Sequence, residues 1–196
     1  MNRPLDASHW RAWRGEAFPD GSWRIADGEL QTIETAPRVD LVSREHFADF
    51  IFGYEFSLPA AGNSGVLYRA SEAAELSWQS GPEIQLLDDA RHPDGQQAAT
   101  CNGALYALRA PTLTTPIEPG RFVSARLVVC GAQVEHWLDG RRVLAYRLDD
   151  PALQEAIAHS KFATYPRFAA EPVGHLVLQH HGDAVRFRNL WIDTSD

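Results

Sequence analysis

Strict alternation of large apolar side chains with small or polar ones limits how this chain can fold. In DFIFGYEFSL, residues 49–58, every second position carries a large apolar side chain: Phe50, Phe52, Tyr54, Phe56 and Leu58. Successive side chains of a β-strand point to opposite faces of its sheet, so this spacing predicts a strand with one buried face. Four aromatic rings on one face need a second layer to cover them. We therefore expect two packed antiparallel sheets with these rings buried.

Similar segments recur along the chain and are separated by turn-forming pairs. Asp27-Gly28 lies between SWRI and ELQTI, while Gly131-Ala132 and Asp139-Gly140 divide RFVSARLVVCGAQVEHWLDGRRVLAYRL into three parts. Asp-Gly pairs favour tight hairpin turns. GHLVLQHHGDAVRFRNLWI adds two strands around Gly182-Asp183. The total of about ten to twelve short strands is typical of an all-β sandwich.

Three segments do not follow the strand pattern. PALQEAIAH, residues 151–159, contains strong helix formers, with Asp150 as a good N-cap and Pro151 at the first helical position. This helix is too short to form a core, so we expect it to pack across one end of the sandwich. Segments 71–81 and 88–102 read as loops, and long polar loops in a sandwich often border a binding face. Without an internal repeat or a linker, residues 1–196 are interpreted as one β-sandwich domain.

Composition excludes several classes of protein. With 26 acidic against 18 basic residues, the net charge of −8 argues against sequence-independent nucleic-acid binding, which needs a basic stripe. No apolar run approaches the length of about 18 residues that a membrane span requires. The first residues lack the apolar core of a secretory signal, which predicts a cytoplasmic location, or a periplasmic one if a leader was removed. Cys101 and Cys130 are expected to be unpaired thiols.

Polar side chains alternate with apolar ones on several of the expected strands. Period-two spacing places Asn63 and Arg69 on the face opposite Val66 and Tyr68, and it places Glu83 and Gln85 together on one face. The remaining candidates are histidines and an amide from later segments: His92, His136, His175, Gln179 and His181. Amide, carboxylate, guanidinium and imidazole groups on one sheet face suit a polyhydroxylated ligand. Contact with water alone would also explain any one of these polar faces.

The order of these motifs resembles that of a known family. DLVSREHFADFIFGYEFSLPAAGNSGVLYR, GPEIQLLDD with HPD, GALYAL, SKFA and GHLVLQHHGDAVRFRNLWI occur in the chain in that order. Over about residues 25–193 the chain is similar to the 3-keto-disaccharide hydrolase domain, also described as a 3-keto-glucoside lyase/3-keto-2-hydroxy-glucal hydratase. The resemblance implies a bacterial carbohydrate-active enzyme. It also implies a concanavalin A-like jelly-roll sandwich whose concave sheet binds sugar.

The residues favour one mechanism over another. A retaining glycosidase needs two carboxyl groups about 5–5.5 Å apart, whereas the positions following Glu83 on its face hold Gln85 and Leu87. A 3-keto sugar needs less, because its C3 ketone acidifies the C2 proton and one base can start elimination at C1. Water can then add to the resulting glycal. We expect Glu83 or a histidine as the base and Arg69 as the group that stabilises the enolate.

The sugar is expected to bind through the other candidates: Asn63, Gln85, His92, His136, His175, Gln179 and His181. No cofactor is expected, and HxH and HExxH spacings are absent, although several histidines and carboxylates could still converge on a divalent metal. The alternatives are a non-catalytic carbohydrate-binding module with the same sandwich and an interaction domain whose concave face meets a protein. The partner is a small-molecule sugar; the aglycone, the anomer and the oligomeric state stay open.

Overall fold

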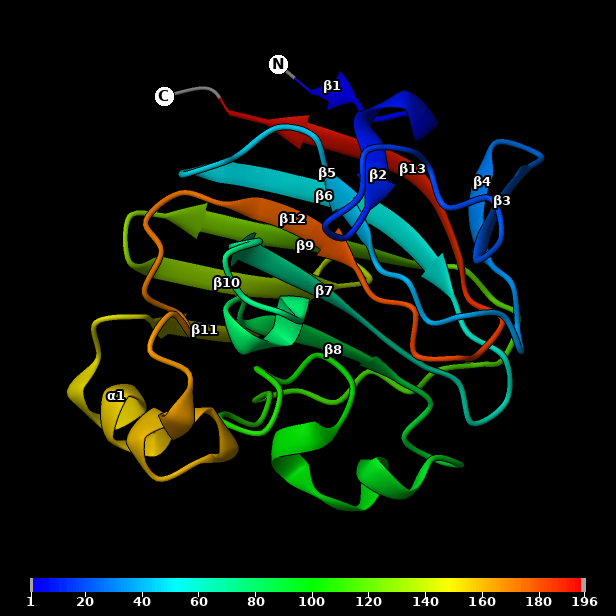
Figure 1. The fold of residues 1–196 in the computed structure, drawn as a ribbon. Helices are drawn as coiled ribbons and strands as arrows, with labels where there is room; N and C mark the ends of the chain where they lie inside the picture. The colour runs from blue at the N-terminus through cyan, green and yellow to red at the C-terminus, as the bar shows by residue number, and fades with distance from the viewer. Residues whose placement is uncertain (1, 195–196) are drawn as a thin grey trace.

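The computed structural model describes residues 2–194 as two antiparallel sheets packed face to face (Figure 1). The larger sheet has the order β11 (Arg141–Arg147), β10 (Gln133–Leu138), β9 (Val123–Cys130), β6 (Phe50–Ser57), β13 (Arg186–Asp193), β4 (Glu29–Thr32) and β3 (Trp23–Ala26), and β1 (Arg3–Pro4) pairs with β13. The smaller sheet has the order β2 (Trp10–Ala12), β5 (Leu41–Ser43), β12 (His175–Leu178), β7 (Asn63–Ala70) and β8 (Glu83–Leu87).

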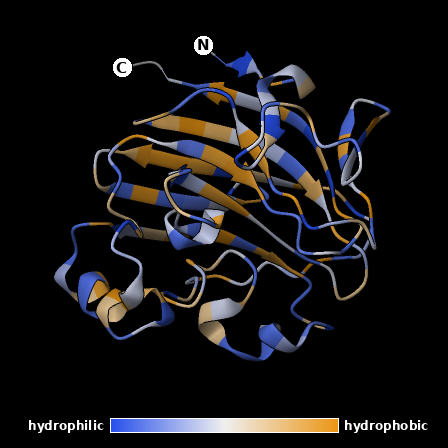
Figure 2. Cartoon of the chain, in the orientation of Figure 1, coloured by the Kyte–Doolittle hydropathy of each residue, from blue (hydrophilic) through white to orange (hydrophobic). Residues whose placement is uncertain are grey.

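The core lies between these sheets and contains the aromatic face of β6. Phe50, Phe52, Tyr54 and Phe56 are all buried there, so the register predicted from their alternation is confirmed. Trp10 of the smaller sheet packs against Phe52 of the larger one, with ring centroids 6.2 Å apart. Hydrophobic colour is concentrated on the strands in Figure 2. Burial of such large apolar side chains between the sheets is the main stabilising contribution to this fold.

Turns form where the glycine-containing pairs predict them. Asp27 and Gly28 have φ values of 52° and 77°, and Asp139 and Gly140 have φ values of 45° and 74°. Two successive residues with positive φ match the twist of the flanking antiparallel strands, which is why Asp-Gly recurs here. The two cysteines are unpaired as expected, with Cys101 buried and Cys130 exposed.

The predicted helix is α1 (Pro151–Ala158), and the Asp150 side chain accepts a hydrogen bond from the backbone N–H of Ala152. It contacts the 3-10 turn η5 (Lys161–Thr164) at one end of the sandwich (Figure 1). Short turns occupy the expected loops: η2 (Ser77–Gln79), η3 (Pro93–Gln96) and η4 (Ala98–Thr100), while η1 (Ala7–His9) precedes β2. Within residues 2–194, no helix is long and apolar enough to cross a bilayer.

Candidate functional site

A pocket of about 170 Å³ opens on the outer face of the smaller sheet. Val66 and Ile84 of β7 and β8 belong to the core between the sheets, so their neighbours in sequence face the other way. The pocket is lined by Asn63 from β7, Glu83 and Gln85 from β8, Gln179 and His181 after β12, and Trp78, Tyr106, Lys161 and Phe162 from loops and turns. Five of the nine residues that the sequence proposed are thus brought together here.

The Glu83 carboxyl group is buried without a hydrogen-bonding partner. The residue is 7% exposed, and no group in residues 2–194 donates a hydrogen bond to its carboxylate. Burial raises the pKa of Glu83 to about 8, while the charge of Lys161 lowers this pKa and that of Asp40 raises it. The carboxyl group can therefore gain and lose a proton near neutral pH, as a general base must.

Three amide oxygens around the pocket have no hydrogen-bond donor in the described chain. They are Asn63 Oδ1, Gln85 Oε1 and Gln179 Oε1. The other end of the Gln85 amide is fixed, because its Nε2 donates to the carbonyl oxygen of Thr100 at 3.3 Å. A buried acceptor without a partner costs free energy. Hydroxyl donors of a sugar would satisfy such acceptors.

Lys161, the only lysine in the chain, also lines the pocket. Its Nζ lies 4.4 Å from the ring centroid of Tyr106 and 5.4 Å from that of Trp78. Burial lowers the pKa of Lys161, while the carboxylates of Glu83 and Asp94 raise it. Sequence reasoning did not propose Lys161, Trp78 or Tyr106 as site residues. Lys161 lies in the SKFA motif, but the sequence alone does not show that this motif packs beside the strands of residues 63–87.

The prediction that Arg69 shares this pocket with Glu83 is wrong. Arg69 has a φ of 47°, and the pairing of β12 with β7 shifts register beside it, so the alternation of β7 ends before this residue. Its guanidinium donates to the carbonyl oxygens of Ala48 at 2.8 Å and Gly131 at 2.9 Å, and it pairs with Asp49 at 3.2 Å. Arg69 thus joins the ends of both sheets.

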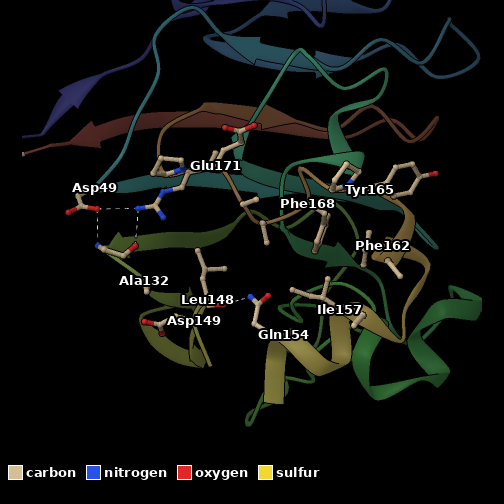
Figure 3. Close-up of a pocket in the computed structure, with 18 residues that line it drawn as sticks. Asp49, Ala132, Leu148, Asp149, Gln154, Ile157, Phe162, Tyr165, Phe168 and Glu171 are labelled. Atoms are coloured by element: carbon tan, nitrogen blue, oxygen red, sulfur yellow. Dashed lines mark hydrogen bonds and ion pairs between the residues drawn. The ribbon is translucent and has the colours of Figure 1, made fainter. Parts of the chain in front are cut away.

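Arg69 lines a second, larger cavity of about 940 Å³. This cavity lies between α1, residues 166–172 and the β9–β10 turn, with Asp49 at one end and Phe162 and Tyr165 toward the other (Figure 3). Phe162 lines both cavities. Arg69 consequently faces a different space from the one that Glu83 faces.

Three predicted histidines also lie outside the pocket. His136 is in phase with Val134 and Leu138, so it points into the core, where its ring nitrogens meet Gly103 O at 2.9 Å and the Tyr146 hydroxyl at 3.1 Å. Assigning its face to the ligand was therefore wrong. Val134 and Leu138 make the face of His136 the apolar face of this strand, whereas the opposite face holds Gln133 and Glu135.

His175 and His92 have local partners instead. His175 Nδ1 lies 2.7 Å from Ser43 O, and its ring packs on His46 at the opposite end of β12 from Gln179. The His92 side chain accepts a hydrogen bond from the backbone N–H of Asp94 and caps η3, and it does not line the pocket. In residues 2–194, no three His, Cys, Asp or Glu side chains converge in a geometry that could hold a metal ion.

Comparison with known proteins identifies the family of this chain. A family model described as the 3-keto-alpha-glucoside-1,2-lyase-like domain matches residues 4–193, a range that includes every residue lining the pocket. The chain belongs to this family. The resemblance seen in the motifs is thereby confirmed. A relative from Bacteroides thetaiotaomicron, named 3-keto-disaccharide hydrolase, is 27% identical over 227 aligned residues, which cover 98% of this chain and 77% of the relative.

Solved structures share the fold of this 3-keto-α-glucoside-1,2-lyase-like domain. A protein from Parabacteroides distasonis, provisionally titled a glycosyl hydrolase, has a TM-score of 0.88 and 25% identity, covering 97% of this chain and 90% of its own. The carbohydrate-binding module CBM66 from Bacillus subtilis has a TM-score of 0.61 at 12% identity, covering 95% and 96% of the two chains. The expected concanavalin A-like sandwich of two antiparallel sheets is confirmed.

Proposed function

We propose that this protein cleaves the glycosidic bond of 3-keto-glycosides, by elimination across C1 and C2 followed by hydration. The family description and the name of the Bacteroides relative support a carbohydrate-active enzyme for this class of sugar. One observation carries the mechanism: among the described residues lining the pocket, Glu83 is the only carboxylic acid. Its pKa of about 8 suits a general base at neutral pH.

Ordinary glycoside hydrolysis would need a second carboxyl group. Retaining enzymes place two of them about 5–5.5 Å apart, and inverting enzymes about 6.5–9.5 Å apart. The next residues on the same face of β8 are Gln85 and Leu87, and neither can ionise. A pocket with one carboxyl group therefore favours a substrate whose own functional group makes a C–H bond acidic, because a single base can then start the reaction.

A C3 ketone is such a functional group. Glu83 removes the proton from C2, and the electron pair forms an enolate with the C3 oxygen. Collapse of the enolate breaks the bond between C1 and the glycosidic oxygen, and the aglycone leaves as an alcohol after taking a proton from water. Water then adds its hydroxyl to C1 of the resulting 3-keto-2-hydroxy-glucal, and a proton returns to C2. A cavity of about 170 Å³ suits one sugar ring, whose hydroxyls would meet the free oxygens of Asn63, Gln85 and Gln179.

The test compares a 3-keto-glucoside with its parent glucoside. We expect turnover of the keto sugar alone, with deuterium at C2 of the product formed in D₂O, after correction for exchange following release. Glu83→Gln keeps the shape of the side chain but removes its basicity, so kcat/KM should fall by about 10²–10⁴. Glu45→Gln, the same change at an exposed glutamate, serves as the control.

Two outcomes would contradict the proposal. Comparable turnover of the parent glucoside, or product without deuterium at C2, would indicate direct hydrolysis. Binding of unoxidised sugars without turnover of any 3-keto-glycoside would instead indicate a carbohydrate-binding module, and binding should then survive the Glu83→Gln change.

A further inference from the structure

We infer that Lys161 is a catalytic residue of this pocket: its ammonium group binds the C3 oxygen of the 3-keto sugar and stabilises the enolate. This inference rests on the proposed function and adds the group that receives the negative charge. Arg69, the group that the sequence suggested for this role, faces the other cavity.

The structure holds the Lys161 ammonium among aromatic rings. Ring centroids of Tyr106, Trp78 and Phe162 lie 4.4, 5.4 and 5.2 Å from Nζ. Ring faces attract a cation but accept none of its N–H donors in the geometry of a conventional hydrogen bond. Within residues 2–194 the Lys161 ammonium donates no hydrogen bond to another side chain, and Glu83 and Asp94 act on it through their charges alone. They are therefore available to a ligand oxygen.

The backbone on either side of Lys161 is anchored, which fixes where the side chain starts. The Ser160 hydroxyl accepts a hydrogen bond from the backbone N–H of Phe162 at 3.0 Å and begins η5. Phe162 itself is buried and stacks on Phe168 with ring centroids 3.9 Å apart. Lys161 thus projects from a well-packed turn.

Charge placement indicates what the ammonium does. Its field reaches Glu83, and His181 is the only other basic side chain among the described residues lining the pocket. Burial lowers the pKa of His181, which favours its neutral form at neutral pH. Enolisation moves negative charge from the Glu83 carboxylate to the C3 oxygen, on the carbon next to C2. A cation at the receiving end stabilises that transition state more than the ground state.

The decisive experiment uses a substrate analogue without a leaving group, 1,5-anhydro-3-keto-glucitol. In D₂O the wild-type protein should exchange its C2 proton, which measures enolisation alone. Lys161→Gln should slow both this exchange and cleavage of a 3-keto-glucoside by about 10²–10³. Lys161→Arg keeps the charge and should recover part of both rates. Arg167→Gln removes an exposed charge from the same segment and should change neither.

Other roles for Lys161 give different results. If it protonated the leaving group, Lys161→Gln would slow cleavage but leave C2 exchange intact, and the inference would be overturned. If it formed an imine with the ketone, borohydride would trap the sugar on the single lysine, with the same consequence. A wild-type protein that neither exchanges the analogue nor cleaves a 3-keto-glucoside would instead overturn the proposed function.

The pH profile separates catalysis from structural support. Lys161→Gln removes a charge that lowers the pKa of Glu83, so the rising limb of the exchange rate should move to higher pH. Lys161→Arg should leave it in place. The other charged or titratable groups near this pair remain in both variants. Asp40, Asp94 and Tyr106 interact with it electrostatically, and His181 lines the same pocket. If Lys161→Gln slows the exchange but the rising part of its pH profile stays at the same pH, Lys161 only supports the fold of the pocket, and the inference is overturned.

Discussion

The carboxylate of Glu83 lies directly against Gly65 of the neighbouring strand. A Cβ on residue 65 would stand 2.0 Å from Glu83 Oε1 and 2.6 Å from its Cδ. β7 and β8 pair with Gly65 opposite Gln85 and Leu67 opposite Glu83, so the Glu83 side chain leans across the sheet into the space above the glycine. The absence of a side chain at residue 65 is therefore what leaves room for the candidate base.

Gly65→Ala should displace the carboxylate and spare the fold. The clashing atoms belong to the far end of the Glu83 side chain, which can move more easily than the backbone. We expect kcat/KM on a 3-keto-glucoside to fall about 10²-fold, because a misplacement of about 1 Å has that effect. Thermal unfolding should change by no more than about 1 kcal/mol. Gly21→Ala is the control, since nothing lies within 4 Å of its added Cβ. Full activity of Gly65→Ala would show that the position of Glu83 does not matter.

Most of the fold was predictable because its signals are local. The alternation along residues 50–58 is enough to predict a strand with one face packed against a second layer. The Asp-Gly pairs predict tight turns at their own positions. The predicted position of Arg69 was wrong because Arg69 has a positive φ, and the sequence gives no sign that a non-glycine residue will adopt this conformation. The prediction that His136 faces the ligand was wrong because it relied on the polarity of the side chain. Val134 and Leu138 lie on the same face of the strand, and their apolar side chains indicate that this face is buried.

The pocket was predictable only in the part that strands supply. Glu83 and Gln85 share a face because they are two residues apart on β8. Trp78 and Lys161 reach the same space from η2 and η5, where tertiary packing decides how the chain returns to the sheet. Contacts of that kind are non-local, and residue spacing does not encode them.

The rate should rise with pH through the pKa of Glu83. A general base acts in its deprotonated form, and burial raises the pKa of this carboxyl group to about 8. We expect kcat/KM to increase about tenfold per pH unit below that value and to level off above it. Elimination without enzyme, measured at each pH, is subtracted as the control. A profile already level at pH 5 would mean that Glu83 is not the base or is not desolvated.

The unpartnered amide oxygens should contribute to binding. Gln179→Leu removes one acceptor while keeping similar bulk, so the Kd for 3-keto-glucose, measured by titration calorimetry, should rise about tenfold. Stability should stay constant or increase, because the wild-type oxygen is buried without a donor. Gln133→Leu makes the same change at an exposed position on the other sheet and should leave binding unchanged. Unaltered affinity of Gln179→Leu would remove this residue from the site.

His136 should matter for stability alone. Its ring nitrogen lies 3.1 Å from the Tyr146 hydroxyl, which is 2.8 Å from that of Tyr68, all within the core. His136→Leu should cost about 1–3 kcal/mol and leave kcat/KM of the folded protein unchanged. Burial lowers the pKa of His136 to about 4, so the wild type should lose stability as pH falls from about 6.5 to 4, and the variant should lose less. A tenfold change in the kcat/KM of His136→Leu would contradict this prediction and indicate that His136 contributes to the functional site.

Glu83→Gln should stabilise the protein while inactivating it. The folded chain holds the Glu83 proton up to about pH 8, whereas the unfolded chain releases it near the ordinary value of 4.5. Between these values the folded state binds more protons, so wild-type stability falls as pH rises through this range. Glutamine at this position does not ionise, so the variant does not lose stability as pH rises through this range. In chemical denaturation, the two proteins should therefore be similar at pH 4, and the variant should be more stable at pH 8 by on the order of 4 kcal/mol. A difference that is the same at both pH values would arise from packing, and it would mean that Glu83 ionises in the folded protein as freely as in the unfolded chain.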